Sequence, residues 1–341
     1  MATYKEAGVD IQKAKRIKQQ IKQLVSSTFN KSVLLESGAF GGAIDAGALK
    51  KMKQPVLVSS VDGVGTKTKI AVAMGKFDSL GFDIVNHSAN DIVCLGAKPL
   101  FFFDYIAASE LKQETVLSIV EGMSKACRQL DMPLVAGETA EMPGVYEKGE
   151  IDIAGSIVGV VEKKKIVDGK KIKKGDVLIG LPSNGLHTNG YSLARKVFFE
   201  TAGKSVNDFL PELNATVGEA LLVPHKNYSK IVLSLMQKFD LHGIAHITGG
   251  SFYKNIGRLL PEGLGAEISK SAWSVPPLFK LMQHLGNVPE EDMYHTFNMG
   301  IGMVLIVAKK EKAKILLALK KLGEKPVAVG EIVGGEGVRI I

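Results

Sequence analysis

Apolar and polar residues follow two different periods along the chain. In residues 10–24 and 114–130, apolar side chains recur every three or four positions, which is typical of amphipathic helices. Residues 55–61 instead form a β-branched run that ends at Asp62-Gly63, which is typical of a strand followed by a turn. Because strands and helices alternate, the predicted fold class is α/β with a mixed α+β character. The other predicted helices are residues 81–95, 192–199, 218–223, 229–239 and 310–322, and the other predicted strands are residues 100–106, 132–137, 151–161, 177–180, 302–308 and 326–333.

A lysine-rich segment at residues 162–176 separates two such successions of strands and helices. The length of 341 residues suits two domains of about 150 residues each. We therefore predict an N-terminal domain at residues 1–166 and a C-terminal domain at residues 167–341.

Composition excludes several classes of protein. Hydrophobic residues make up 45% of the chain, which is enough for a packed core and argues against disorder. No uninterrupted apolar run reaches the roughly 18 residues of a membrane span, and the first residues lack the apolar centre of a secretory signal. Cys94 and Cys127 are too few for a disulfide framework or a four-cysteine zinc site. We therefore expect a cytoplasmic protein without membrane association.

The formal net charge of +8 would suit a polyanionic partner. Aromatic side chains that stack on bases are few, at 6% of the chain, and they are not interleaved with the lysines. We therefore interpret the basic runs as solvated faces and connectors, and we expect no nucleic-acid partner. These runs lie at residues 13–22, 162–165, 170–174 and 309–325.

Three carboxylates are the first candidates for chemistry: Asp62, Asp91 and Glu138. Each lies near glycines and near what we interpret as a junction between a strand and a loop. A single such carboxylate is usually a helix cap or a turn residue. Several at the ends of different strands can converge on Mg²⁺, which binds one or two carboxylates together with substrate phosphates. Neither a Walker loop nor a G-x-G-x-x-G motif occurs, so a nucleotide site would be of another kind.

The stretch Asp91-x-x-x-x-Gly96-Ala97-x-Pro99 resembles a known ATP-binding signature. That signature belongs to the superfamily of aminoimidazole ribonucleotide synthetase, selenophosphate synthetase, thiamine monophosphate kinase and a hydrogenase maturation factor. Within the superfamily, the chain is specifically similar to the phosphoribosylformylglycinamidine cyclo-ligases, which are the aminoimidazole ribonucleotide synthetases. The stretches that carry this closer resemblance are residues 4–10, 61–67, 137–144, 183–192, 245–250 and 296–303.

The resemblance implies a fold and a reaction. The implied fold has two α/β domains, and the N-terminal sheets of two subunits form a barrel in a homodimer. The C-terminal domain, a mixed sheet with flanking helices, would complete the active-site cleft. The implied reaction belongs to purine biosynthesis: formylglycinamidine ribonucleotide and ATP give 5-aminoimidazole ribonucleotide, ADP and phosphate. Phosphorylation of the amide oxygen would make the formyl carbon a better electrophile and provide a leaving group.

The implied chemistry assigns roles to nucleotide-binding residues. Asp62, Asp91 and Glu138 would hold Mg²⁺ on the ATP phosphates, and Lys67 would neutralise charge that develops there. The remaining nucleotide-binding candidates are Gly63, Gly65, Thr66, Asn90 and Gly96.

Two glycine-rich loops are candidates for the ribose phosphate of the substrate, and the sequence does not rank them. Backbone N–H groups in such loops can cradle a phosphate. One loop spans residues 38–42 and includes Gly41 and Gly42, and the other is Thr248-Gly249-Gly250.

Histidines in polar loops are candidates for proton transfer. His187 lies in a loop bracketed by glycines, so it either moves a proton during ring closure or stabilises the loop. Asn189 would then orient the substrate, and His246 is a second proton-transfer candidate. We interpret His87, His225, His242 and His284 as surface or packing residues.

The chain departs from the family pattern at a few positions, of which Ser251 and His295 bear on the substrate-phosphate pocket. Two alternatives to the cyclo-ligase remain. One is another phosphoryl-transfer enzyme of the same superfamily, such as a small-metabolite kinase. The other is an inactive basic binding or scaffold protein.

Overall fold

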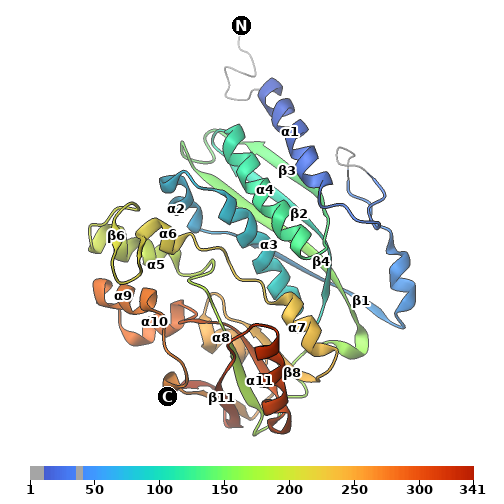
Figure 1. Cartoon of the computed structure of the whole chain (residues 1–341), viewed down its shortest axis with the longest axis vertical. Coiled ribbons are helices and arrows are strands. Elements are labelled where there is room, and N and C mark those ends of the chain that lie inside the picture. Colours follow the sequence, from blue (N-terminus) through green and yellow to red (C-terminus); the bar gives the residue numbers. More distant parts are fainter. Residues whose placement is uncertain (1–10, 36–40) are drawn as a thin grey trace. The chain divides into compact units, whose positions relative to one another are not determined.

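The computed structural model describes residues 11–35 and 41–341 (Figure 1). Residues 4–10, which carry part of the family resemblance, and residues 38–40 of the first glycine-rich loop lie outside the described residues. The chain divides into two compact units. Unit 1 comprises the residues up to Ile92 and Pro99–Lys164, and unit 2 comprises Val93–Lys98 and Lys165–Ile341.

Unit 1 contains a four-stranded sheet in the order β1-β4-β2-β3. β1 and β4 pair antiparallel, and β2 and β3 pair parallel. In Figure 1, α3 and α4 run in front of these strands, and α1 packs against α4. The elements are α1 (Ile11–Ser26), β1 (Pro55–Gly63), α2 (Lys67–Met74), α3 (Asp78–Val93), β2 (Lys98–Ala108), α4 (Gln113–Gln129), β3 (Leu134–Glu141) and β4 (Ile151–Glu162), with a 3-10 helix at Ala46–Lys51.

One face of this sheet exposes large apolar side chains. Leu57 and Val61 of β1 are 62% and 70% exposed, and Phe103 and Tyr105 of β2 are 38% and 36% exposed. Alternate residues of a strand point to opposite faces, so Leu57 and Val61 belong to one face of β1. The neighbouring position Val58 is buried, at 8% exposure.

Unit 2 contains a six-stranded sheet in the order β12-β9-β11-β5-β10-β8. Every residue of β10 is buried, and α7 and α11 pack their apolar faces against β5, β8 and β10. The elements are β5 (Val177–Pro182), α5 (Tyr191–Arg195), a π-helical turn (Lys196–Thr201), β6 (Phe209–Leu210), β7 (Ala215–Thr216), α6 (Val217–Leu221), α7 (Ser229–Met236), β8 (Leu241–His246), α8 (Ser251–Gly257), β9 (Leu264–Ile268), α9 (Pro277–Gly286), α10 (Glu290–Thr296), β10 (Ile301–Val307), α11 (Lys312–Lys321), β11 (Val327–Gly334) and β12 (Gly337–Ile340).

The predicted α/β class is confirmed, since both units combine a sheet with helices. Each predicted strand and helix has a counterpart, although the bounds differ by a few residues. The predicted helix at 192–199 is instead a short α-helix that continues as a π-helical turn. The sequence analysis missed helices α2, α8, α9 and α10 and strands β6, β7, β8, β9 and β12. Among the described residues, no helix is long and apolar enough to cross a membrane.

Candidate active site

In unit 1, β1 and α3 bring Asp62, His87 and Asp91 together. His87 Nε2 lies 2.7 Å from Asp62 Oδ2 and 3.6 Å from Asp91 Oδ2. The Ser60 hydroxyl also donates to Asp91 Oδ2, at 3.3 Å. Asp83, His87 and Asp91 are spaced by four residues along α3, so they lie on one face of that helix.

The histidine and the carboxylate stabilise each other's charged forms. Burial raises the pKa of Asp62, but the hydrogen bond and the charge of His87 outweigh it, so the net pKa lies below 3.8. Burial lowers the pKa of His87, but the hydrogen bond to Asp62 and the charges of nearby carboxylates raise the net pKa above 6.5. His87 is only 4% exposed. It is therefore a buried residue, as the packing interpretation allows, and its contacts also make it a candidate for the site.

Lys67 is held away from solvent by Asp83. Its Nζ lies 2.9 Å and 2.8 Å from the two carboxylate oxygens of Asp83, and both side chains are 0% exposed. Burial lowers the pKa of Lys67 more than the Asp83 charge raises it. The ion pair anchors the first residue of α2 to α3. That Lys67 neutralises charge on the ATP phosphates stays a prediction.

The loop between β1 and α2 contains the predicted backbone donors. The Gly63 N–H donates to Asp62 Oδ1 at 2.7 Å, and the Val64 N–H donates to the Ile153 carbonyl at 3.1 Å. Gly65 has a φ of +67°, with open space where a side chain would be, and Thr66 directly precedes α2. Hydrogen bonds therefore fix the start of the loop, and α2 follows its end. Among the described residues, no atom lies within 4 Å of the position that a Cβ of Gly65 would take.

Asn90 and Gly96, two of the nucleotide-binding candidates, are both buried. Asn90 is fully buried within α3. In unit 2, Gly96 has a φ of +80°, and a Cβ there would lie 2.6 Å from Met236 Cε. Packing alone therefore explains why a glycine stands at position 96. A side chain there would strain the backbone and collide with Met236.

Glu138 lies apart from Asp62 within the sheet of unit 1. Asp62 is on β1 and Glu138 is on β3, and β4 and β2 lie between these edge strands. Among the described residues, ligand atoms of Asp62, Asp91 and Glu138 do not gather within 4.8 Å of one another. A single chain therefore does not place all three on one cation. Glu138 also lies inside β3, and Asp91 lies inside α3, so neither follows a strand end as expected.

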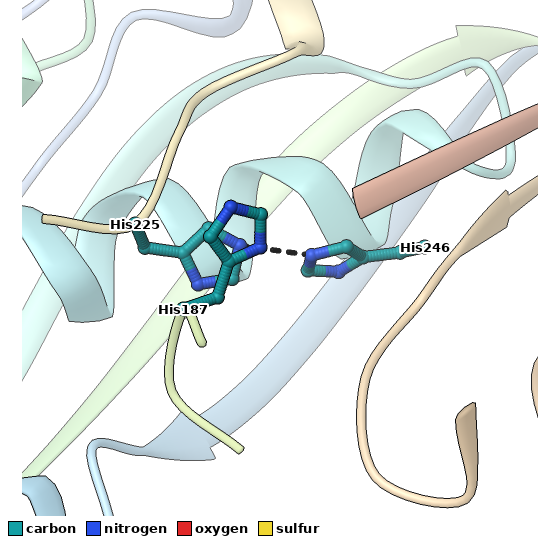
Figure 2. Close-up of side chains that lie close together, drawn as sticks. All are labelled: His187, His225 and His246. Carbon is teal, nitrogen blue, oxygen red and sulfur yellow. Dashed lines mark hydrogen bonds between the residues drawn. The ribbon is translucent and has the colours of Figure 1, made fainter. Parts of the chain in front are cut away.

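In unit 2, three loops or strand ends bring together His187, His225 and His246 (Figure 2). His187 comes from the loop after β5, His225 from the loop before α7, and His246 is the last residue of β8. All three are buried, at 1%, 1% and 5% exposure. Nε2 of His225 lies 3.0 Å from Nε2 of His246, and the ring of His187 stacks on that of His225. His225 is therefore no surface residue.

Close packing fixes the position of His187. Its Nε2 lies 3.0 Å from Asn184 Oδ1, and its backbone is left-handed, with a φ of +62°. Gly302 of β10 leaves the room for this ring, because a Cβ there would lie 2.5 Å from His187 Cε1 and 2.2 Å from the Tyr228 hydroxyl. These contacts hold the imidazole of His187 in one orientation within its loop.

The second glycine-rich loop lies beside Asn189. A Cβ on Gly249 would lie 3.3 Å from Asn189 Oδ1, so these two predicted site residues are neighbours. Gly250 directly precedes α8, and Thr248 Oγ1 lies 3.4 Å from Asn255 Oδ1. Ser251 is buried and donates its hydroxyl to the Phe297 carbonyl at 2.6 Å. The structure thus groups Asn189 with the Thr248–Gly250 loop.

The described part of the first glycine-rich loop belongs to unit 1. Gly41 has open space at its Cβ position, and Gly42 packs directly against Val135 of β3. Gly42 is therefore a packing position.

Asn298 is a further site residue that the sequence analysis did not assign. Its Oδ1 accepts hydrogen bonds from the Ser183 hydroxyl and the Gly300 N–H, both at 2.9 Å. Its Nδ2 donates to the Gly185 carbonyl at 2.9 Å. Asn298 therefore ties the stretch 296–303 to the loop that carries His187. The available signal was the position of Asn298 inside the family-like stretch 296–303.

Comparisons with known proteins agree with these two units. The family model described as AIR synthase related protein, N-terminal domain, matches residues 44–161, and the corresponding C-terminal domain model matches residues 173–341. Among solved structures, the chain is similar to Escherichia coli HypE, with a TM-score of 0.70 and 19% identity over 96% of this chain and 93% of that one. It is also similar to a hydrogenase maturation protein HypE in complex with ATP, with a TM-score of 0.61 and 16% identity over 93% of this chain and 84% of that one. At these identities, the likeness shows the fold.

Full-length relatives are much closer in sequence. The chain is 48% identical to a phosphoribosylformylglycinamidine cyclo-ligase of Alkaliphilus oremlandii, over 98% of this chain and 97% of the relative. It is 49% identical to the enzyme of the same name from Geotalea daltonii, over 97% of this chain and 94% of the relative. The chain therefore belongs to the phosphoribosylformylglycinamidine cyclo-ligase family.

Proposed function

We propose that the chain converts formylglycinamidine ribonucleotide and ATP into 5-aminoimidazole ribonucleotide, ADP and phosphate. The observation that carries this proposal is the near-full-length identity of 48% to a named cyclo-ligase. The buried imidazole cluster of unit 2 and the carboxylate pair of unit 1 supply the kinds of group that this chemistry needs. The reaction belongs to purine biosynthesis and forms a carbon–nitrogen bond, so the protein is a ligase.

The reaction requires two bond changes in order. The formyl amide oxygen attacks the γ-phosphorus of ATP, which forms an oxygen–phosphorus bond and releases ADP. The ribosyl-bearing nitrogen then attacks the activated formyl carbon, the carbon–oxygen bond breaks, and phosphate leaves. That nitrogen and the formyl amide nitrogen each lose a proton, and a proton shift from the CH2 group to the amidine nitrogen gives the aminoimidazole. Phosphate is a far better leaving group than oxide or hydroxide. This is why the reaction consumes ATP.

Asp62 and Asp91 fit the needs of a Mg²⁺ ion. Their carboxylates lie on neighbouring elements and their side chains are 41% and 29% exposed, and oxygen ligands are those that Mg²⁺ prefers. The ion would neutralise phosphate charge on ATP. His87 would orient Asp62 through its 2.7 Å contact. The glycine-containing loop of residues 63–66 would offer backbone N–H groups to the phosphates.

Residues of unit 2 are suited to the ribonucleotide. His187 and His246 would exchange protons with the substrate during ring closure, since imidazole is the side chain that does so most readily near neutral pH. Asn189, beside the loop of Thr248–Gly250, would orient the substrate. The N–H groups of that loop would bind its ribose phosphate. The described contacts favour this loop over Gly41-Gly42, because Gly42 is packed against Val135.

We also propose that a second copy of the chain covers the apolar face of unit 1. That face presents Leu57, Val61, Phe103 and Tyr105, each at least 36% exposed. Contiguous apolar surface of this kind is typical of protein interfaces. A homodimer would bury it against the same face of its partner. Neither Cys94 nor Cys127 forms a disulfide, which suits a reducing compartment, so we propose that the enzyme is cytoplasmic.

The proposal is tested by incubating the purified protein with Mg²⁺, ATP and formylglycinamidine ribonucleotide. ADP and the aminoimidazole product should form in equal amounts, and neither should form without the ribonucleotide. ADP release with thiamine monophosphate in place of the ribonucleotide would instead indicate a small-metabolite kinase.

A further inference from the structure

Ser251 joins the second glycine-rich loop to the stretch 296–303. Its hydroxyl donates to the Phe297 carbonyl at 2.6 Å, and its N–H donates to the Thr248 carbonyl at 2.8 Å. Ser251 and Phe297 are both buried, at 0% and 1% exposure, so water does not compete for this hydroxyl. The C-terminal end of the loop is therefore bonded to a second segment of unit 2.

Phe297 also supports the loop that ends at Gly190. A Cβ on Gly190 would lie 2.2 Å from Phe297 Cε1, so the backbone that follows Asn189 packs directly on this ring. Asn189 in turn lies beside the glycine-rich loop, since a Cβ on Gly249 would lie 3.3 Å from Asn189 Oδ1. Phe297 thus contacts both loops, one through its carbonyl and one through its ring. The Ser251 hydroxyl therefore fixes the backbone of Gly249 relative to the side chain of Asn189.

The backbone of Ser251 has a conformation that serine seldom adopts. Its φ is +49°, in the left-handed region that favours glycine, and such a conformation persists only where surrounding contacts hold it. Asn255 provides one of these contacts, because its Nδ2 donates to the Ser251 carbonyl at 2.8 Å. The Arg258 guanidinium, which can only donate, bonds to Asn255 Oδ1 and fixes the orientation of that amide. A glycine would adopt this φ without strain, so the hydroxyl is what serine adds at this position.

We propose that Ser251 is a positioning residue for the subsite that binds the ribose phosphate. Its hydroxyl holds the Thr248–Gly250 loop where the loop backbone and the Asn189 amide face the same ribonucleotide. Gly249 is exposed, so a ligand can reach it. A loop that is already ordered loses little conformational freedom when phosphate binds, so the hydroxyl strengthens that binding. This inference rests on the proposed function, and it assigns to Ser251 no contact with the substrate.

Hydrogen–deuterium exchange of the full chain tests the anchoring itself. Ser251→Ala removes the hydroxyl and keeps the Cβ, whereas Ser251→Gly removes both the hydroxyl and the backbone strain. Because the proposal assigns the effect to the hydroxyl, peptides that cover residues 247–252 should exchange at least about tenfold faster in both variants. Exchange in the rest of unit 2 should stay as in the wild type. Normal exchange of these peptides in either variant would overturn the proposal.

Steady-state kinetics tests the consequence for binding. A contact that helps the substrate and the transition state equally raises KM when it is lost and leaves kcat unchanged. We expect both variants to have a KM for formylglycinamidine ribonucleotide raised about tenfold, with kcat and the KM for ATP within about twofold of the wild type. An unchanged KM for the ribonucleotide, or an equal rise in the KM for ATP, would overturn the proposal.

Ser229→Ala is the matched control. Ser229 is also 0% exposed in unit 2, and its hydroxyl donates to Asn227 Oδ1 at 2.6 Å. This variant therefore loses a buried hydrogen bond of the same length that does not involve the Thr248–Gly250 loop. It should lower the melting temperature to a similar extent and leave the KM for the ribonucleotide unchanged. The same rise in KM for the control would show that lost stability causes the effect, and it would contradict the proposal.

Binding of ribose 5-phosphate separates this inference from the proposed function. If the wild-type protein does not convert the ribonucleotide, the proposed function fails, and isothermal titration calorimetry with ribose 5-phosphate still decides the role of Ser251. We expect the wild type to bind this probe and the Ser251→Ala variant to bind it at least about tenfold more weakly. No binding by the wild type, or equal affinities of the two proteins, would overturn the proposal.

Discussion

His87 Nε2 lies 2.7 Å from Asp62 Oδ2, which ties the middle of α3 to the end of β1. One helical turn earlier, Asp83 of the same helix holds Lys67, the first residue of α2. One face of α3 therefore fixes both ends of the loop at residues 63–66. A phosphate that binds to this loop would meet a backbone whose conformation is already fixed, which lowers the cost of ordering the loop.

Asp91 provides the first prediction. Asp91→Asn keeps the shape and removes the charge, so we expect an unchanged melting temperature and a kcat reduced by about 100-fold or more. Steady-state kinetics at saturating Mg²⁺ measures the effect. Normal turnover would remove Asp91 from the metal site.

Glu138 supplies the matched control for that experiment. Because two strands separate it from Asp62 in the sheet of one chain, we expect Glu138→Gln to reduce turnover much less than Asp91→Asn. An equal loss in the two variants would show that Glu138 reaches the phosphates after all.

The buried pair of Lys67 and Asp83 provides a prediction about stability. Removal of one partner leaves an uncompensated buried charge, so Lys67→Met should lower the free energy of unfolding by about 3–5 kcal/mol. Asp83→Leu should have a similar effect, and the double variant should lose less than the sum of the two. Urea unfolding measures all three. A Lys67→Met variant of normal stability with a raised KM for ATP would indicate a direct phosphate contact instead.

Asp104 of β2 makes stability depend on pH. Burial, with a contribution from the charge of Glu138, raises its pKa from 3.8 to about 7. The folded state therefore binds the proton more tightly than the unfolded state does. Its contribution is fully present below pH 3.8, and it is lost as the pH rises through about 7. Urea unfolding at pH 5 and pH 8 should show a smaller decrease for Asp104→Asn than for the wild type, and equal decreases would contradict this pKa.

The apolar face of unit 1 predicts the oligomeric state. Light scattering after size-exclusion chromatography should give twice the mass of one chain. Leu57→Asp places a charge within the proposed interface, so this variant should elute as a monomer. Lys321→Asp, on α11 of unit 2, is the control and should remain a dimer. A wild-type monomer would contradict the proposed dimer.

The sequence pattern predicted the long, strongly periodic elements of the fold. α1 and α4 have clear apolar stripes, and β10 is a continuous apolar run. The pattern missed β8, which contains Gly243 and two histidines, and it missed helices of 7 to 10 residues such as α8 and α9. Such short elements depend on tertiary packing more than on local periodicity. The sequence pattern also could not predict the order of the strands in the sheet. That order places β4 and β2 between Asp62 on β1 and Glu138 on β3.

The sequence predicted those site residues that residue type and near neighbours in the sequence are enough to identify. Asp62 and Asp91 followed from their residue type and their glycine neighbours, and the structure places both beside one histidine. His87 and His225 were missed because burial and partner contacts depend on the folded chain. The spacing of Asp83, His87 and Asp91 at intervals of four was a usable signal, since it places them on one helix face.

The most direct test of the proposed activity measures ADP release by the purified protein in the presence of Mg²⁺ and ATP, with and without formylglycinamidine ribonucleotide. The account predicts ADP release that depends on the ribonucleotide and equals the amount of 5-aminoimidazole ribonucleotide formed. ADP release that is the same without the ribonucleotide, or that yields no aminoimidazole product, would contradict it.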